Sequence, residues 1–165
     1  MKYFIGVDTS KFKIHIAVLD ENSKIFKLDM LASTEKKDIE RMWELKNLFE
    51  DWLIDFSNNN DVNVDDMVVT VEGSIMLQNP KTSFDIAKTI NGIEMACCSI
   101  AAPCFEIQTT SWKKMVIGNG ACKKEDIMKF AQTKWGKKVF SEQDYADAAC
   151  IALHQFMLMS DKKRS

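Results

Sequence analysis

Two short apolar segments, each followed by a single acidic residue, constrain the fold more than any other feature of the sequence. The segment Lys2–Val7 leads into Asp8. The segment Met67–Val71 leads into Glu72 and is almost wholly apolar, which is typical of a strand buried on both faces of a sheet. Small or turn-forming residues follow each acid. If the two strands are neighbours, both carboxylates emerge at the same edge of the sheet.

The segments between these two strands predict an antiparallel meander followed by a helix. Lys13–Leu19 and Ile25–Leu31 alternate in polarity and are reached through tight turns, as expected of successive antiparallel strands. Thr34 is the expected N-cap of a long helix. Apolar residues in this helix recur at the 3–4 spacing expected of a helix that lies on a sheet. They are Ile39, Met42, Trp43, Phe49, Trp52, Leu53 and Phe56.

The second half of the chain adds one more strand and several helices. Asn79-Pro80 opens a helix that is apolar on more than one side over residues 80–98, which favours a subunit interface as well as a core contact. Cys104–Ile107 is the expected fifth strand, and short helices follow around 111–116 and 124–134 before a last helix capped by Ser141. We therefore expect one α/β domain whose five-stranded mixed sheet, an antiparallel meander plus parallel strands, is flanked by helices.

Composition limits the class of protein. The chain has 165 residues, the size of one globular domain, and 46% of them are hydrophobic. No apolar run approaches the ~18 residues of a membrane span, and Asp8 interrupts the N-terminus before a signal-peptide region could form. We expect a soluble protein that is not secreted and lies in the cytoplasm or another DNA-containing compartment. The five cysteines form an odd set without C-x-x-C spacing, so we expect reduced thiols and no zinc site.

The charge is unevenly distributed along the chain. The whole sequence carries a net charge of -2, which does not indicate nucleic-acid binding. Residues 109–139, however, hold eight lysines against Glu125 and Asp126. A lysine stripe can bind phosphates even on an acidic protein, because screening limits the reach of distant charges to about 8–10 Å. A solvated lysine face would have the same composition, so charge alone leaves both interpretations open.

Two further carboxylates join the strand-end acids. Asp144 and Asp147 are three residues apart and share one face of the last helix. Four converging carboxylates repel one another unless a cation lies among them, and Mg²⁺ prefers oxygen ligands. Two such ions about 4 Å apart can activate water and stabilise a leaving oxygen in phosphodiester hydrolysis. Taken singly, each acid could instead be a turn former, a helix cap, a surface acid or a lysine partner.

Four sequence blocks resemble the RuvC-type Holliday junction resolvases, which belong to the ribonuclease H-like nuclease superfamily. Together the blocks extend from residue 5 to about residue 155, nearly the whole chain. In chain order they are Ile5-Gly6-Val7-Asp8, Val71-Glu72, a K-x-x-x-x-G-x-G segment at 113–120 followed by Lys124, and Asp144-Tyr145-Ala146-Asp147-Ala148. The first two are weak motifs, whereas the glycine block followed by D-x-A-D-A is fairly specific.

The resemblance implies a homodimer, joined through the helix over 80–98, that binds four-way DNA junctions and makes paired symmetric nicks with Mg²⁺, for which Mn²⁺ can substitute. It also implies a nuclease domain over residues 1–158 and a short basic tail over 159–165. By this resemblance the metal ligands are Asp8, Glu72, Asp144 and Asp147. Lys113 and Lys124 would lie near the scissile phosphates. The expected DNA contacts are Ile75, Lys113, Lys114, Gly118, Gly120, Lys123 and Lys124, with Ile75 at a position where the family often has an aromatic residue.

Other functions share this chemistry or this fold. A nuclease for flaps and other branched DNA, or a ribonuclease for RNA–DNA hybrids, would use the same acids. The first block also resembles insertion-sequence transposases of the DEDD type, which carry a further large domain. A non-catalytic nucleic-acid-binding module could keep the fold without needing a self-repelling acid cluster. His15 and the tryptophans are interpreted as structural residues, except that Trp112, inside the lysine block, is left open.

Overall fold

The meander and the two later strands form one mixed sheet in this computed structural model, with the strand order β3-β2-β1-β4-β5. The antiparallel part consists of β1 (Tyr3–Thr9), β2 (Lys13–Leu19) and β3 (Ile25–Ala32). Strands β4 (Met67–Glu72) and β5 (Cys104–Ile107) extend the sheet beyond β1 in parallel. The expected α/β class and mixed sheet are confirmed.

The structure describes residues 1–73, 80–140 and 142–161, and in this part of the chain five strands and five α-helices form the fold. A single 3₁₀ turn, Val64–Asp66, precedes β4. The α-helices are α1 (Asp38–Asn60), α2 (Pro80–Ser99), α3 (Thr109–Ile117), α4 (Lys124–Trp135) and α5 (Gln143–Asp161). None of the helices in these ranges is long and apolar enough to cross a bilayer. The five cysteines are free, as expected.

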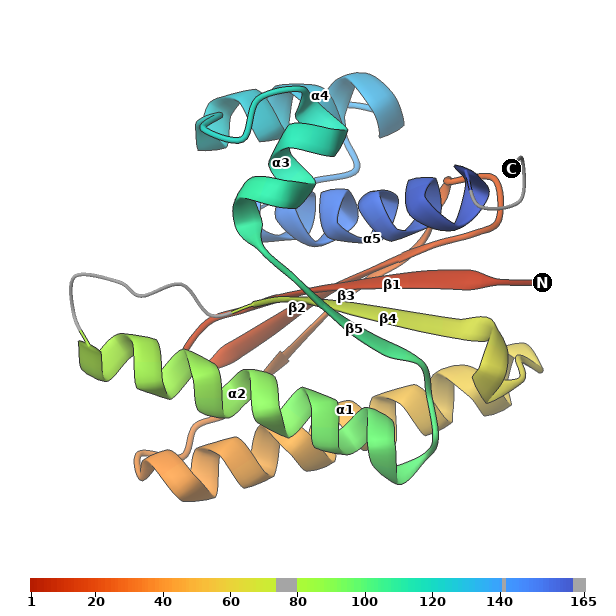
Figure 1. Ribbon diagram of the computed structural model, residues 1–165. Coiled ribbons are helices and arrows are strands. Elements are labelled where there is room, and N and C mark those ends of the chain that lie inside the picture. Colours follow the sequence, from red (N-terminus) through yellow and green to blue (C-terminus); the bar gives the residue numbers. More distant parts are fainter. Residues whose placement is uncertain (74–79, 141, 162–165) are drawn as a thin grey trace.

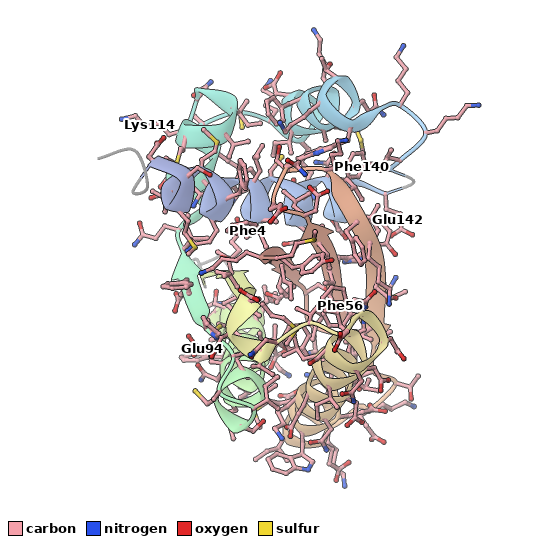
Figure 2. All side chains as sticks on the ribbon, turned by 90° about the vertical axis from the view of Figure 1, so that its right-hand side faces the viewer. Phe4, Phe56, Glu94, Lys114, Phe140 and Glu142 are labelled. Atoms are coloured by element: carbon pink, nitrogen blue, oxygen red, sulfur yellow. The ribbon has the colours of Figure 1, made fainter. Side chains whose placement is uncertain are left out.

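Helices cover both faces of the sheet. Helices α1 and α2 lie on one face, and α3, α4 and α5 lie on the other (Figure 1). Figure 2 shows the two cores that result, with Phe4 on the side of α5 and Phe56 on the side of α1. Because β1 and β4 are covered on both faces, both strands are almost wholly apolar until they reach their acidic ends.

Helix α5 lies unusually close to β1. A Cβ atom built on Gly6 would come within 2.0 Å of the Ala148 carbonyl oxygen and within 2.5 Å of the Ala152 backbone nitrogen. Glycine in the strand and alanine on the helix therefore permit a backbone approach that larger residues would block. The contact fixes the height of α5 above the sheet, and α5 carries Asp144 and Asp147 in its first turns.

The start of α1 differs from the prediction. The helix begins at Asp38 with Lys37 as its N-cap, not at Thr34. The Ser33 hydroxyl accepts the Glu35 N–H at 3.1 Å, and this local turn competes with helix formation. The buried side of α1 also differs from the predicted stripe. Its first buried residues are Arg41, Leu45 and Phe49, and two members of the predicted stripe are exposed. Those two are Ile39, at 72% exposure, and Trp43, at 52%.

Candidate active site

Strand register places Asp8 and Glu72 side by side. Val7 pairs with Val71 across the parallel β1–β4 ladder, so the next residue of each strand is an acid. Val7 and Val71 belong to the core under α1 and α2. Because side chains alternate along a strand, the two acids face the opposite side, toward α5. This edge holds the carboxyl ends of β1 and β4, on the side of the sheet away from the start of β1 and the end of α5 (Figure 1). It is where open α/β sheets bind ligands.

Helix α5 brings the other two predicted acids to the same place. Asp144 and Asp147 lie in its first turns, and their charges act on Asp8. The Gln143 side-chain amide donates a hydrogen bond to Asp147 Oδ1 at 3.0 Å. Asp144 Oδ2 lies 3.7 Å from Nδ1 of His15 on the neighbouring strand β2. The structure thus brings Asp8, Glu72, Asp144 and Asp147 together.

The electrostatics of the site reflect this convergence. Burial, and then the charges of Glu72, Asp147 and Asp144, raise the pKa of Asp8 well above its ordinary value. Burial also raises the pKa of Asp147 to about 6, and the charges of Glu72 and Asp144 add to the effect. The Gln143 hydrogen bond and the Lys124 ammonium partly oppose this increase in Asp147. Ionisation of the whole cluster is therefore unfavourable without a cation.

Trp112 has a role in the site that the sequence left open. Its buried indole N–H donates a hydrogen bond to Glu72 Oε1, with a donor–acceptor distance of 2.7 Å. Lys113 places its ammonium 5.6 Å from the centre of the same indole ring. The first turn of α3 therefore holds the Glu72 carboxylate in one orientation. The two partners are 40 residues apart in the sequence, so no local pattern could have indicated the bond.

His15 is the second residue whose place the sequence analysis missed. It pairs directly with Asp8 across the antiparallel β1–β2 ladder, and its side chain is 2% exposed. Its ring lies edge-on to Tyr145 and has Nε2 3.5 Å from Glu142 Oε2. The interpretation of His15 as a purely structural residue does not account for this position inside the carboxylate cluster.

The predicted lysines lie on α3 and at the start of α4, and Lys124 is the one whose charge acts on the acids. Lys124 lies near enough to lower the pKa of both Asp8 and Asp147. Lys123 is the N-cap of α4, and its backbone N–H donates to the Asp126 carboxylate at 3.0 Å. Lys114 is exposed on α3.

The two predicted glycines shape the turn between α3 and α4. Gly118 ends α3 with a φ of 90°, in the left-handed region that favours glycine, and its N–H donates to the Lys114 carbonyl at 3.0 Å. A Cβ on Gly120 would lie 3.1 Å from the Thr110 carbonyl oxygen, a tight contact. Both glycines therefore have local backbone reasons to be present. Ile75 lies outside the described residues.

The donor set fits a divalent cation. Asp8, His15 and Asp144 each offer a ligand atom, and these atoms all lie within 4.8 Å of one another. Burial and the neighbouring carboxylates raise the pKa values of Asp8 and Asp147, and Lys124 opposes only part of this effect. Hard cations with carboxylate ligands supply such charge.

The sheet order, the helices on both faces and the acids at the strand ends together define a ribonuclease H-like fold of the RuvC type. T. thermophilus RuvC in complex with a Holliday junction substrate has this fold: it matches with a TM-score of 0.76 over 98% of this chain and 97% of that one, at 15% identity. A second T. thermophilus RuvC structure matches with a TM-score of 0.75, at 15% identity over 96% of both chains.

The yeast mitochondrial Holliday junction resolvase Ydc2 is a more distant neighbour. It matches with a TM-score of 0.56 and 16% identity over 97% of this chain and 80% of that one. No protein-family model matches the sequence, and no curated protein matches it either. At these identities the likeness is one of fold, and it extends over nearly the full length of the chain.

Proposed function

We propose that the protein is a metal-dependent endonuclease that resolves four-way DNA junctions by paired, symmetric nicks. The observation that carries the proposal is the convergence of Asp8, Glu72, Asp144 and Asp147 at the carboxyl end of a RuvC-like sheet. A binding module would gain nothing from half-buried carboxylates that repel one another. The whole-length match to a RuvC structure that holds a junction substrate supports branched DNA as the substrate.

The four acids would hold Mg²⁺, with Mn²⁺ able to substitute. When bound, two such ions would supply an activated water and stabilise the leaving oxygen of the phosphodiester. The other residues would orient the acids. Trp112 holds Glu72, and Gln143 holds Asp147. Lys124 offsets part of the negative charge before the phosphates arrive.

The basic segment 109–139 would bind the DNA backbone beside these acids. It forms the α3–α4 layer above α5 (Figure 1), and its excess of lysine suits phosphate contacts. The residues proposed to contact DNA are Lys113, Lys114, Gly118, Gly120, Lys123, Lys124 and Ile75. Since phosphate contacts release counterions, binding is expected to weaken steeply as salt increases.

Paired nicks require two active sites, which a homodimer through α2 would supply. Helix α2 keeps large apolar side chains in solvent, with Phe84 68% exposed and Met95 47% exposed. Exposed apolar residues on a helix that already packs against α1 are typical of a subunit interface. A two-fold axis at this helix would relate the two sites symmetrically.

The test is the variant Asp8→Asn with a labelled four-way junction. Cleavage should be lost while junction binding is kept or strengthened, because a negative charge facing the phosphates has been removed. Asp55→Asn is the matched control, since Asp55 is an exposed acid on α1, on the opposite face of the sheet. Cleavage by Asp8→Asn at the wild-type rate would show that the assigned site is wrong. Junction binding without cleavage by the wild type would favour a binding module.

A further inference from the structure

We propose that His15 is a direct ligand of the metal ion held by Asp8 and Asp144, and that its imidazole makes this position of the site favour Mn²⁺ over Mg²⁺. The inference rests on the proposed function to the extent that the carboxylate cluster holds a metal. It adds a nitrogen ligand from β2, a strand whose residues carry none of the four acids.

The geometry places a ring nitrogen of His15 where a ligand is needed. His15 faces Asp8 across the ladder, and one of its nitrogens lies within 4.8 Å of oxygens on both Asp8 and Asp144. Two ligand atoms on opposite sides of an ion with bonds of about 2.1 Å are separated by about 4.2 Å. The spacing of the three groups therefore matches a shared ion with little movement of the side chains.

Among the residues that the structure describes, neither ring nitrogen of His15 has a hydrogen-bond partner. Nδ1 lies 3.7 Å from Asp144 Oδ2, which is too long for a hydrogen bond. Nε2 is buried and makes no hydrogen bond, although Glu142 Oε2 lies 3.5 Å away. Buried polar atoms are nearly always paired. The ring nitrogen that carries the lone pair is an acceptor, and so are the nearby carboxylate oxygens. A metal ion between them would bind both kinds of atom.

The ligand chemistry determines the preferred metal. Mg²⁺ binds oxygen ligands almost exclusively and keeps several waters, whereas imidazole suits transition metals. Mn²⁺ accepts both carboxylate oxygen and imidazole nitrogen. A site with two carboxylates and one imidazole should therefore bind Mn²⁺ more tightly than Mg²⁺, while the all-oxygen ligands Glu72 and Asp147 would discriminate less.

The test is pulsed electron paramagnetic resonance of Mn²⁺ bound to the full chain without DNA. Direct ligation by imidazole gives a coupling from ¹⁴N. The chain has two histidines, so His154→Gln is the matched control, because His154 is also buried but belongs to α5. The coupling should be present in the wild type and in His154→Gln, and absent in His15→Gln. The preference for Mn²⁺ over Mg²⁺, measured by competition, should fall at least about tenfold in His15→Gln.

The outcomes separate this inference from the proposed function. A wild-type Mn²⁺ spectrum without nitrogen coupling overturns the ligand assignment even if His15→Gln fails to fold. A coupling that survives in folded His15→Gln, or an unchanged metal preference, also overturns it. Nitrogen coupling in a protein that cuts no junction would leave the ligand in place and refute the nuclease. Junction cleavage by a protein whose Mn²⁺ spectrum lacks nitrogen coupling would refute the ligand assignment and leave the nuclease in place.

Discussion

The close approach of α5 to β1 makes Gly6→Ala the most informative single substitution. The new Cβ would lie 2.0 Å from the Ala148 carbonyl oxygen and 3.0 Å from the Ala152 Cβ. The first partner is backbone, so no side-chain rotation relieves the contact. Helix α5 must move away from the sheet, and it carries Asp144 and Asp147 with it.

The size of the effect follows from the distances. Ordinary contacts of a Cβ atom begin at 3.4 Å, so α5 must retreat by roughly 1 Å or more. Overpacking of this kind costs about 1–3 kcal/mol of unfolding free energy, and a backbone clash belongs at the upper end. A misplacement of about 1 Å in a catalytic group costs on the order of 100-fold in rate. We therefore expect a folded but less stable protein whose cleavage rate falls about 100-fold.

Urea unfolding and single-turnover junction cleavage measure the two effects separately. Gly92→Ala is the matched control, because it adds the same methyl group to a buried glycine on α2 with its nearest contact at 3.3 Å. We expect it to change stability slightly and cleavage little. Adding Ala152→Gly to Gly6→Ala should rescue little, since the shorter contact is with backbone. Wild-type stability and cleavage in Gly6→Ala would refute the argument that this contact positions α5.

Three further predictions concern other parts of the molecule. Trp112→Phe removes a hydrogen bond to a charged group, worth about 1.5–3 kcal/mol. It should slow junction cleavage by roughly 10–100-fold and lower the thermal melting temperature by roughly 5–10 °C. The pKa of Asp147 is raised to about 6 in the folded protein, so ionisation of Asp147 disfavours folding. The free energy of unfolding without metal should therefore fall as pH rises from about 4 to 6. Urea titrations of Asp147→Asn over the same pH range should show a smaller fall. Asp85 is buried with Lys11 2.6 Å away, so Asp85→Asn should cost about 3 kcal/mol in urea unfolding, and an unchanged midpoint would contradict this.

The sequence was sufficient to predict the elements that carry the acids. Each strand is a short apolar run with few alternatives, and the D-x-A-D spacing puts two acids on one helical face whatever the helix packs against. The sequence alone leaves the pairing of β1 with β4 as an assumption, and the register Val7–Val71 confirms it. These local patterns suffice because the site is built at the ends of regular elements.

The residues that orient the acids could not be predicted in this way. His15 faces Asp8 only because of the β1–β2 register, and nothing in its own strand distinguishes it from a structural histidine. The bond from Trp112 to Glu72 depends on how α3 docks after β5, a tertiary contact. The start of α1 was misplaced because the Ser33 turn competes with the helix for the backbone groups that follow it.

The most direct test of the central claim is cleavage of a labelled, mobile four-way junction by the purified protein with Mg²⁺ or Mn²⁺. Linear duplex, flap and RNA–DNA hybrid are incubated beside it, and the products are mapped to the nucleotide. The account predicts paired nicks at symmetric positions on two opposing strands of the junction, with the linear duplex left intact. Equal cutting of flaps would indicate a broader branched-DNA nuclease. Cleavage confined to the hybrid, or no cleavage of any substrate, would contradict the claim.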